Sequence, residues 1–411
     1  MRAVAGIRTE RGPEPSPPVE AASQETSLTR SSLRRPRVLL VTTVSRTLEA
    51  FLLPYAEHFR SRGWRVEAAA AGVKNSESCI RHFDDVHEMS WSRQPARVDR
   101  DVRSAVEISR LLRTGFDLVH VHTPVAAFIA RIVAGTLGPK RPPIIYTAHG
   151  LHLQRGGARV ANFVYGGLES IAGRWTDYLV VVNEEDYDTA CSRGFVPSER
   201  VLLLNGIGID LSIFDPVTHV ESALRFRREI GVGSQDFLIG MVAEFTPTKR
   251  HEDVIAALGQ ISDPSIHLVL AGQGPLLERV ARDVATKRIA RQVHMVGFRA
   301  DIAAVIAASQ LVVLASSREG LPRSILEAQA LGIPVVGTDV RGIRDLLSNG
   351  RGILVPVRSP HALACAINES ARNPGAAKER ARRARQKLST YSLDRILREH
   401  EELYERALER Q

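Results

Sequence analysis

Short runs of consecutive apolar residues alternate with longer helical segments along most of the chain, and this alternation constrains the fold more than any other feature. Strands that are apolar on both faces belong to parallel sheets that helices cover on both sides. The pattern pauses near Asp210 and then restarts, which predicts two such sheets in succession. The expected strands are 38–43, 66–70, 117–122, 144–147, 178–183 and 201–204 in the first half, and 237–242, 266–270, 293–296, 311–314 and 335–336 in the second.

The length of the chain agrees with two domains. A single hydrophobic core rarely grows past about 250–300 residues, and this chain has 411. We therefore expect one domain at 37–210, a second at 211–390 and a last helix at 391–411. Residues 1–36 hold several prolines, serines and glutamates without an apolar run, which predicts a disordered tail and no secretory signal.

Composition restricts the compartment and the partners. The hydrophobic content of 44% and the charged content of 25% are typical of a soluble globular protein. No apolar run approaches the roughly 20 residues of a membrane-spanning helix. Three widely spaced cysteines, Cys79, Cys191 and Cys365, indicate a reducing, cytoplasmic compartment rather than a disulfide framework or a zinc site. The net charge of +9 indicates an anionic partner, which leaves nucleic acid, anionic lipid and anionic substrate open.

Two groups of basic residues bear on that choice. Segment 378–387 has six basic residues, one acid and no aromatic residue, so we favour a solvated or lipid-facing helix over a nucleic-acid arm. The other group suits an anionic acceptor at a membrane surface, and we expect peripheral contact with anionic membranes and no nucleic-acid partner. It consists of Arg60, Arg62, Arg65, Arg93, Arg97, Arg100 and Arg103.

Residues 316–338 form the most informative candidate site. Gly320 and Pro322 break the chain just after Glu319, and the helix that follows carries Glu327. The backbone N–H groups of 320–324 have no intrahelical acceptor, so they form an anion site between the two carboxylates. This order suits a nucleotide-sugar. One carboxylate would bind the sugar hydroxyls, the N–H groups the diphosphate, and the second carboxylate the ribose.

Other candidate residues also follow expected strands. Parallel sheets bind ligands at the carboxyl ends of their strands, so the loops at these ends should converge on one cleft. Lys249 and Arg250 lie in such a loop, and we expect them to bind a diphosphate. His149 begins another loop, whereas His120 is expected to be a satisfied core histidine. No group of His, Cys or Asp residues has the spacing of metal ligands.

The spacing of Glu319 and Glu327 resembles the E-x7-E signature of retaining glycosyltransferases of family 4, and further segments extend the resemblance from Arg37 to the C-terminus. Segment 242–250 is similar to the family's phosphate-binding loop, 294–298 to its base-binding turn, and 205–210 to its interdomain strand end. Segments 90–95, 121–125, 146–150 and 183–186 resemble the bacterial branch that builds capsular polysaccharides and exopolysaccharides.

The resemblance implies the GT-B architecture, which has two Rossmann-like domains facing a central cleft. It implies transfer of a hexosyl or N-acetylhexosaminyl group from a nucleotide-sugar donor, with a bias to UDP, to a lipid-linked or saccharide acceptor at the inner face of the plasma membrane. It also implies that no cofactor and no bound metal take part, because lysine and arginine stabilise the leaving group. The C-terminal helix would cross back to the first domain.

Residue roles follow from the positions that match the family's motifs. The expected catalytic residues are His149 and Glu319. The expected donor-binding residues are Lys249, Arg250, Gly297, Phe298, Gly320, Leu321, Pro322 and Glu327. Loop positions in the first domain make Thr43, Arg93, His122 and Thr123 the expected acceptor-binding residues.

One departure from the family and two alternatives qualify this prediction. Glu244 stands where the commonest family pattern has arginine, so the phosphate charge must be met by Lys249 and Arg250. A nucleotide-sugar 2-epimerase has the same architecture, but it would need an acid and a base in the first domain. A catalytically silent binding protein is the other alternative; loss of Glu319 or Lys249 would have indicated it, and both are present.

Overall fold

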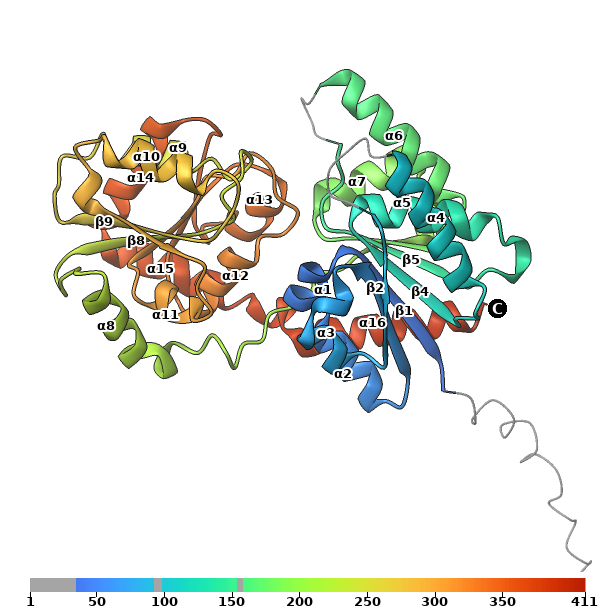
Figure 1. Cartoon of the computed structure of the whole chain (residues 1–411). Helices are drawn as coiled ribbons and strands as arrows, with labels where there is room; N and C mark the ends of the chain where they lie inside the picture. Colours follow the sequence, from blue (N-terminus) through green and yellow to red (C-terminus); the bar gives the residue numbers. More distant parts are fainter. Residues whose placement is uncertain (1–34, 92–97, 154–157, 411) are drawn as a thin grey trace, which may run out of the picture. The chain divides into compact units, whose positions relative to one another are not determined.

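The computed structural model describes residues 35–91, 98–153 and 158–410, with only the backbone described at 98–101. The tail expected for 1–36 lies almost wholly outside these residues, as does Arg93. The described part of the chain contains two parallel sheets, each covered by helices (Figure 1). The prediction of a two-sheet α/β fold from the alternating apolar runs is therefore confirmed.

The first sheet has seven parallel strands in the order β3-β2-β1-β4-β5-β6-β7. Leu39 in β1 pairs with Val119 in β4, so the apolar cores of the two central strands lie side by side. The strands are β1 Arg37–Val44, β2 Arg65–Ala71, β3 Asp85–Glu88, β4 Leu118–His122, β5 Ile144–Ala148, β6 Tyr178–Val181 and β7 Val201–Leu203. The helices are α1 Ser45–Phe51, α2 Leu53–Ser61, α3 Glu77–His82, α4 Val98–Leu112, α5 Pro124–Gly135, α6 Arg159–Gly173 and α7 Glu184–Arg193.

The second sheet has six parallel strands in the order β10-β9-β8-β11-β12-β13. The strands are β8 Phe237–Val242, β9 Ile266–Ala271, β10 Val293–Gly297, β11 Leu311–Leu314, β12 Val335–Thr338 and β13 Ile353–Val355. The helices are α8 Val220–Glu229, α9 His251–Leu258, α10 Leu277–Ala285, α11 Ile302–Ala307, α12 Arg323–Ala330, α13 Arg341–Leu347, α14 Pro360–Arg372 and α15 Pro374–Arg385. Single-turn 3-10 helices occur at Val73–Asn75, Gly138–Lys140, Ser198–Arg200, Pro216–His219, Ala290–Gln292 and Leu388–Tyr391.

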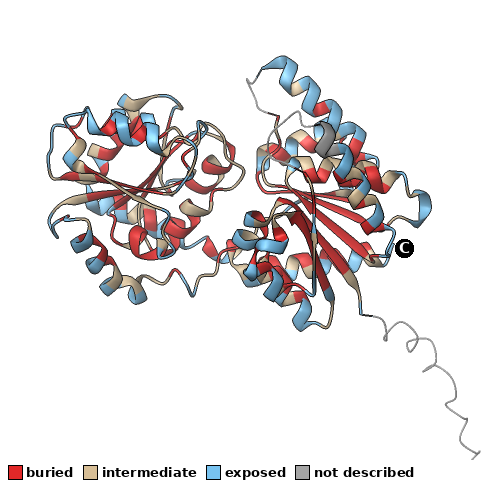
Figure 2. Ribbon diagram, viewed as in Figure 1, coloured by how far each residue is buried: buried red, intermediate tan, exposed pale blue. Residues whose placement is uncertain are grey.

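Strand order explains why the candidate loops meet. In the first sheet β1 lies between β2 and β4, and in the second β8 lies between β9 and β11. The chain leaves on opposite sides at such a switch point, which opens a crevice at the carboxyl ends of the two strands. The loops after β8 and β11 are those that carry Lys249 and Glu319. Figure 2 shows both sheets as buried, so these ligand-facing loops stand on rigid supports.

The last helix, α16 Leu393–Leu408, contributes to the core of the first sheet's domain rather than the second. Tyr404 stacks on Phe59 of α2 with ring centroids 4.5 Å apart, and both side chains are fully buried. Ser392, just before the helix, forms a parallel bridge with Ile209. The chain therefore returns to its first half after completing the second sheet.

Two local features of the first and second sheets have identifiable physical causes. Helix α1 ends at Phe51, and α2 begins at Leu53. Pro54 occupies the first turn of α2, where its ring has no N–H to donate and restarts rather than continues a helix. Strands β3 and β13 are absent from the expected set, and both are short strands at the edge of a sheet. Strand β3 has no buried residue, whereas β13 ends on buried Val355.

Candidate functional site

Lys249 and Glu319 form an ion pair at the switch point of the second sheet. Lys249 lies in the loop after β8 and Glu319 in the loop after β11, and their Nζ and Oε1 atoms are 2.5 Å apart. The side chains are 23% and 11% exposed, so the pair is accessible from one side. The Ser317 N–H also donates to the Thr248 carbonyl at 2.8 Å, which ties the two loops together.

Arg250 differs from its neighbour Lys249. Its backbone is left-handed, with φ at 53°, at the start of α9. The guanidinium binds Asp253 in two hydrogen bonds of 2.6 and 2.8 Å and approaches Glu252 at 3.1 Å. These bonds raise the pKa of Arg250 and hold it against its own helix. Of the two expected phosphate cations, only Lys249 faces a carboxylate of the other loop.

Gly320 brings the second sheet's loop against the His149 loop of the first sheet. A Cβ atom at Gly320 would lie 1.9 Å from the His149 carbonyl oxygen, a distance that no side chain tolerates. A Cβ atom at Gly342 would lie 1.7 Å from the Gly320 carbonyl oxygen. The Asn183 side chain also donates to the Gly320 carbonyl at 3.3 Å. Glycine at 320 therefore permits backbone contact between loops of the two sheets, and glycine at 342 permits close packing of α13 on the Gly320 loop.

The residues after Gly320 begin helix α12. Pro322 is buried at the N-cap with extended backbone, and Leu321 packs against Gly206, where a Cβ atom would meet it at 2.7 Å. Glu327 is 8% exposed within the helix, and burial raises its pKa although the positive charge of Arg323 opposes the shift. Arg323 lies 3.4 Å from Glu327 and donates to the Ala50 carbonyl at 2.6 Å.

Histidine rings line the first sheet's side of the site. His149 Nε2 and His122 Nδ1 are 3.1 Å apart, and the two rings stack. Burial lowers the pKa of His149 to about 4, with a further contribution from His400. Burial also keeps the pKa of His122 well below its ordinary value. The imidazole of His149 is therefore neutral above mildly acidic pH, and in that form it can take part in hydrogen bonds but carries no charge.

His120 is the satisfied core histidine that the sequence predicts. It is fully buried, with Nδ1 2.5 Å from the Tyr404 hydroxyl and Nε2 2.7 Å from the Thr147 hydroxyl. Two expected acceptor residues lie nearby at the ends of β1 and β4. The Thr43 N–H donates to the Thr123 hydroxyl at 2.9 Å, and the two hydroxyls are 2.7 Å apart.

A cavity of about 600 Å³ lies beside the ends of β8 and β9. Phe298 lines it with 66% of its surface exposed, next to Gly297, whose φ is +67° and whose carbonyl accepts the Gly272 N–H at 2.7 Å. Glu244 and Arg46 line the same cavity. Phe298 of the expected base-binding turn and the unusual Glu244 thus share one cavity with residues of helix α1.

Arg341 is a residue that the sequence analysis missed. It is 5% exposed, and it donates to the Glu319 carbonyl at 3.1 Å, to the Leu153 carbonyl at 3.0 Å and to the Leu151 carbonyl. Its guanidinium also pairs with the buried carboxylate of Asp186. Asp186 belongs to the 183–186 motif, but nothing in the sequence connects that motif with a residue 155 positions away.

Both carboxylate oxygens of Asp186 have partners at this contact. Its second carboxylate oxygen accepts from the Leu151 N–H at 2.9 Å and from the Asn183 side chain at 2.8 Å. Helix α7 therefore fixes the loop after β5 and the loop after β11 through one buried ion pair, which we call the Asp186–Arg341 clasp. A second, more exposed pair, Arg344 with Glu185 at 3.3 Å, lies beside it.

Within the described residues, one group of side chains has the spacing of metal ligands: Glu67, Asp85 and His87. It lies on β2 and β3 at the edge of the first sheet. Burial alone would raise the pKa of Glu67, but hydrogen bonds from His87, Arg37 and Arg65 lower it to about 2. The carboxylate is already neutralised by Arg37 and Arg65, so the group is better explained as an ion-pair cluster.

Of the basic residues expected on the first domain, the four whose side chains the structure describes are paired with acids. Arg60 binds Asp84 at 3.0 Å, Arg62 binds Glu401 at 3.2 Å, and Arg103 binds Glu107 at 3.0 Å. Arg65 is one of the cations on Glu67. In α15, Arg382 and Arg383 both bind Glu379. These arginines therefore contribute less free charge than their number in the sequence suggests.

Comparisons with known proteins identify the family and the fold. Residues 48–211 match the family model described as Glycosyltransferase Family 4, and residues 223–387 match the model described as Glycosyl transferases group 1. The protein EpsD of Bacillus subtilis (strain 168) is 30% identical over 378 residues, which cover 90% of this chain and 96% of EpsD.

An Escherichia coli relative is 27% identical over 256 residues, 61% of this chain and 65% of its own. Its name is UDP-Gal:alpha-D-GlcNAc-diphosphoundecaprenol alpha-1,3-galactosyltransferase. Among solved structures, Anabaena Alr3699/HepE in complex with UDP and glucose superimposes with a TM-score of 0.74 at 21% identity, over 90% of this chain and 99% of that one.

Proposed function

The chain belongs to glycosyltransferase family 4 and has the GT-B fold, and on that basis we propose that it transfers a sugar from a UDP-sugar to a lipid-linked saccharide with retention of configuration. The observation that carries the proposal is the Lys249–Glu319 pair, next to which Gly320 meets the backbone carbonyl of His149. A cation and a carboxylate at strand ends of the second sheet thus lie beside the loop that begins at His149 in the first sheet. That arrangement suits a sugar whose leaving group is a diphosphate.

We propose that each of these groups responds to the charge that develops as the bond between the sugar and the diphosphate breaks. Cleavage of a glycosyl phosphate bond builds positive charge on the sugar ring and negative charge on the departing diphosphate. In the proposed mechanism Lys249 and the N–H groups that follow Glu319 stabilise the leaving diphosphate. Glu319 orients a sugar hydroxyl, neutral His149 hydrogen-bonds the sugar, and the leaving phosphate accepts the proton of the acceptor hydroxyl.

The remaining donor contacts follow from the cavity and from α12. We assign the nucleotide base to the cavity beside Phe298, because an exposed aromatic ring next to a tight Gly297 turn offers a stacking surface. Glu327 is assigned to the ribose hydroxyls. Arg250 is bound to Asp253, so we propose that it mainly holds the conformation of the phosphate-binding loop and contributes less to direct phosphate contact.

Donor and acceptor classes are supported by the relatives. The E. coli relative's name specifies a UDP-sugar and an undecaprenol diphosphate acceptor, and the Anabaena structure contains UDP. Thr43, His122 and Thr123 at the ends of β1 and β4 are the proposed acceptor contacts. Three free cysteines favour a reducing compartment, so we propose action at the cytoplasmic face of the membrane in cell-surface polysaccharide synthesis.

We further propose that transfer needs no divalent cation, because Lys249 neutralises the diphosphate directly. Treatment with EDTA should leave the rate of transfer unchanged. Restoration by magnesium or manganese of a rate that EDTA had abolished would contradict this. The ion-pair cluster at Glu67 gives a control, since Glu67→Gln should change stability without creating any metal dependence.

The decisive experiment is a direct transfer assay. The purified protein would be incubated with a panel of UDP-sugars and with a polyprenyl-diphosphate-linked monosaccharide, and products would be identified by mass spectrometry and by the anomeric configuration of the new linkage. We expect transfer from one UDP-sugar with the α configuration retained. Inversion of configuration, or conversion of the donor sugar to its epimer without any acceptor, would refute the proposal.

A further inference from the structure

Helix α6 has its hydrophobic side on the outside. Its large apolar side chains follow a spacing of three to four residues, which places them on one face of the helix. Phe163 is 80% exposed and Val160 76% exposed. The exposed side, which we call the α6 face, consists of Val160, Phe163, Val164, Leu168 and Ile171. In a helix whose outer side only meets water, the polar residues occupy this position instead.

The inner side of α6 explains why the helix cannot rotate to bury these residues. It is made of small residues, with Gly166, Ala172 and Gly173 buried. A Cβ atom at Gly173 would lie 1.8 Å from the Phe195 carbonyl oxygen, so no larger residue fits against the domain there. Glu169 also points inward and pairs with buried Arg131 of α5 at 2.9 Å. The exposure of the α6 face is therefore built into the packing.

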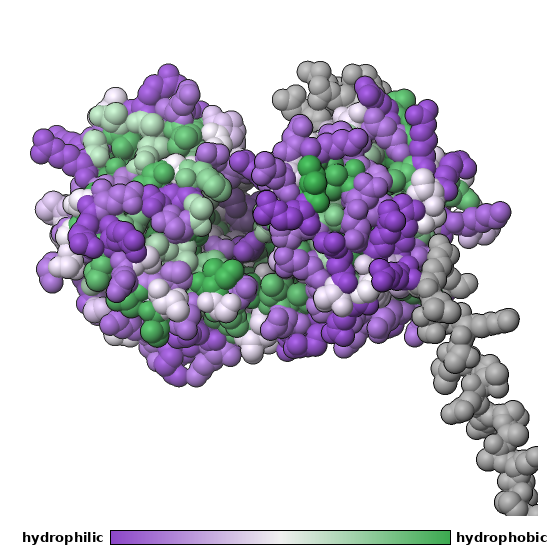
Figure 3. Space-filling model, turned by 60° about the horizontal axis from the view of Figure 1, so that its bottom comes forward, coloured by the Kyte–Doolittle hydropathy of each residue, from purple (hydrophilic) through white to green (hydrophobic). Residues whose placement is uncertain are grey.

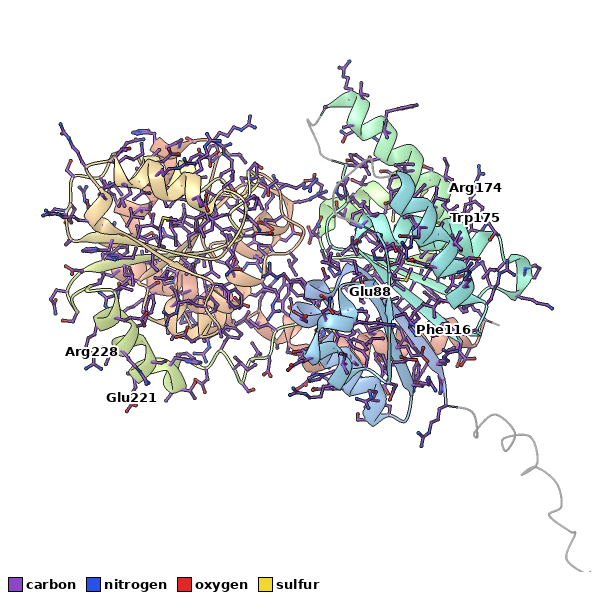
Figure 4. All side chains as sticks on the ribbon, viewed as in Figure 1. Glu88, Phe116, Arg174, Trp175, Glu221 and Arg228 are labelled. Atoms are coloured by element: carbon purple, nitrogen blue, oxygen red, sulfur yellow. The ribbon has the colours of Figure 1, made fainter. Side chains whose placement is uncertain are left out.

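Two aromatic contacts fix the position of α6. Trp175, which follows the helix and is labelled in Figure 4 with Arg174, packs so closely on α5 that a Cβ atom at Gly135 would lie 2.3 Å from its ring. In the middle of the helix, the Tyr165 ring lies 4.9 Å from that of His152, in the loop that begins at His149. Figure 1 shows α6 beside α5 at the margin of the first sheet's domain. Helix α6 is thus in contact with the loop of the proposed site.

The charges around the α6 face are those that an anionic surface attracts. The only acid of α6, Glu169, is turned inward to Arg131, so the face itself carries no negative charge. Arg159 begins the helix and Arg174 caps it, and both are exposed. An apolar face with arginines at its ends is typical of helices that lie in the boundary between lipid headgroups and acyl chains. Figure 3 shows the surface from another side, where hydrophilic residues are interspersed with several groups of apolar residues.

We propose that the α6 face inserts into the surface of an anionic lipid bilayer and seats the first sheet's domain on the membrane. The proposal rests on the proposed function, because a lipid-linked acceptor must reach the loops after β1, β4 and β5 from a membrane. Burial of the α6 face in the bilayer would place the His149 loop next to that acceptor. No helix among the described residues has the length and apolar content to span a bilayer, so the contact is peripheral.

The structure also sets the character of the binding. Many arginines of this domain are already paired with acids, so their attraction to the bilayer is weakened. The apolar area of the α6 face then provides most of the affinity, and hydrophobic burial is not screened by salt. Binding to vesicles should therefore persist at high salt, with anionic lipid strengthening it through Arg159 and Arg174.

Vesicle flotation tests the proposal with the full chain. The variant is Phe163→Ser combined with Leu168→Ser, and both positions are exposed, so the fold should not depend on them. The matched control is Val217→Ser combined with Leu224→Ser, two exposed apolar residues elsewhere. With vesicles of phosphatidylcholine and phosphatidylglycerol, we expect the wild type and the control to float. The α6 variant should bind about tenfold more weakly or worse, since it loses two large apolar side chains.

Three outcomes would overturn the proposal: the wild type fails to float, the α6 variant floats as well as the wild type, or high salt releases the wild type completely. The α6 face could instead contact a second copy of the chain, and light scattering tests this. A wild-type dimer that the α6 substitutions dissociate would assign the α6 face to that contact. Transfer to a water-soluble acceptor analogue keeps the proposed function separate, because the α6 variant should retain it. If the wild type transfers no sugar to the analogue, the proposed function is refuted. Flotation of the wild type and of the α6 variant would still decide whether the α6 face binds lipid.

Discussion

At the scale of single residues, the Lys249–Glu319 pair gives the most direct test of the proposed chemistry. The Glu319 carboxylate lies 2.5 Å from Lys249, beside the proposed position of the diphosphate and the sugar. Replacing the carboxylate by an amide keeps its size and removes its charge. The ground-state interaction with the nucleotide should then change little, whereas stabilisation of the charged transition state should be lost.

We therefore expect Glu319→Gln to lower kcat by about 100-fold, the scale of one lost electrostatic contact, with nucleotide affinity within a few-fold of wild type. Steady-state kinetics and calorimetry with UDP measure the two quantities separately. Glu252→Gln is the matched control, because Glu252 lies on the adjacent helix α9 with its side chain 53% exposed. A kcat near that of the wild type in Glu319→Gln would mean that Glu319 has a structural role only.

The buried histidines predict how stability depends on pH. Burial lowers the pKa of both His149 and His400 to about 4. An unfolded histidine has a pKa of about 6.5, so between these values the unfolded state binds more protons and stability falls as the pH falls. At pH 5.5 each histidine should reduce the free energy of unfolding by about 1 kcal/mol relative to pH 7.5.

Urea unfolding at the two pH values measures this difference. His149→Gln should reduce the pH dependence, and the same substitution at exposed His361 should leave it unchanged. Equal stability of the wild type at both pH values would show that the histidines are not buried in solution as they are here.

Residue types and loop positions could be predicted from the sequence, but partners could not. Lys249 and Glu319 follow adjacent strands, and the switch-point rule is enough to place their loops together. The same rule treats Arg250 like Lys249, although Asp253 binds it three residues away. Arg341 carried no motif at all, because its importance comes from carbonyls and a carboxylate contributed by distant loops.

At the scale of elements, α7 and α13 are coupled by the Asp186–Arg341 clasp. Both side chains are almost fully buried, at 1% and 4% exposure. Removal of one partner leaves an uncompensated buried charge, which costs roughly 3–5 kcal/mol. Arg341→Ala should therefore lower the free energy of unfolding by about that amount and also lower kcat, because Arg341 holds the Glu319 carbonyl.

Arg344→Ala is the control on the same helix. Its ion pair with Glu185 is more exposed, with the arginine side chain at 43%, and should be worth about 1 kcal/mol or less. Urea unfolding of the two variants side by side decides the matter. Equal losses in both would show that the buried clasp contributes no more than a surface pair.

Elements could be predicted wherever the local signal was strong. Continuous apolar runs predict the central strands, since a parallel sheet that helices cover on both faces buries such runs. Strand β3 has the sequence Asp-Val-His-Glu, which has no apolar run, and pairing with β2 alone makes it a strand. The inverted polarity of α6 could have been read from its periodicity, but only the structure shows which side faces the domain.

At the scale of the whole molecule, the last helix of the chain completes the hydrophobic core of the first sheet's domain. Helix α16 buries Ile396, Leu397, Leu403 and Tyr404 in the core that β1 and α2 begin. Each such side chain contributes about 1.5–3 kcal/mol when fully buried, so the four contribute roughly 6–12 kcal/mol. Whole domains are stable by only about 5–15 kcal/mol. The first sheet's domain should therefore depend on α16 for its stability.

A chain that ends at Ser392 tests this dependence. We expect it to lose the cooperative unfolding of the first sheet's domain and to expose Phe59 and Tyr55, which pack against α16. The second sheet does not use α16, so its domain should stay folded and show a separate calorimetric transition. A chain that ends at Leu408 keeps all of α16 and serves as the control. If the shorter chain unfolds like the control, the first half is a self-sufficient domain, and the contacts of Tyr404 with Phe59 and His120 add little to its stability.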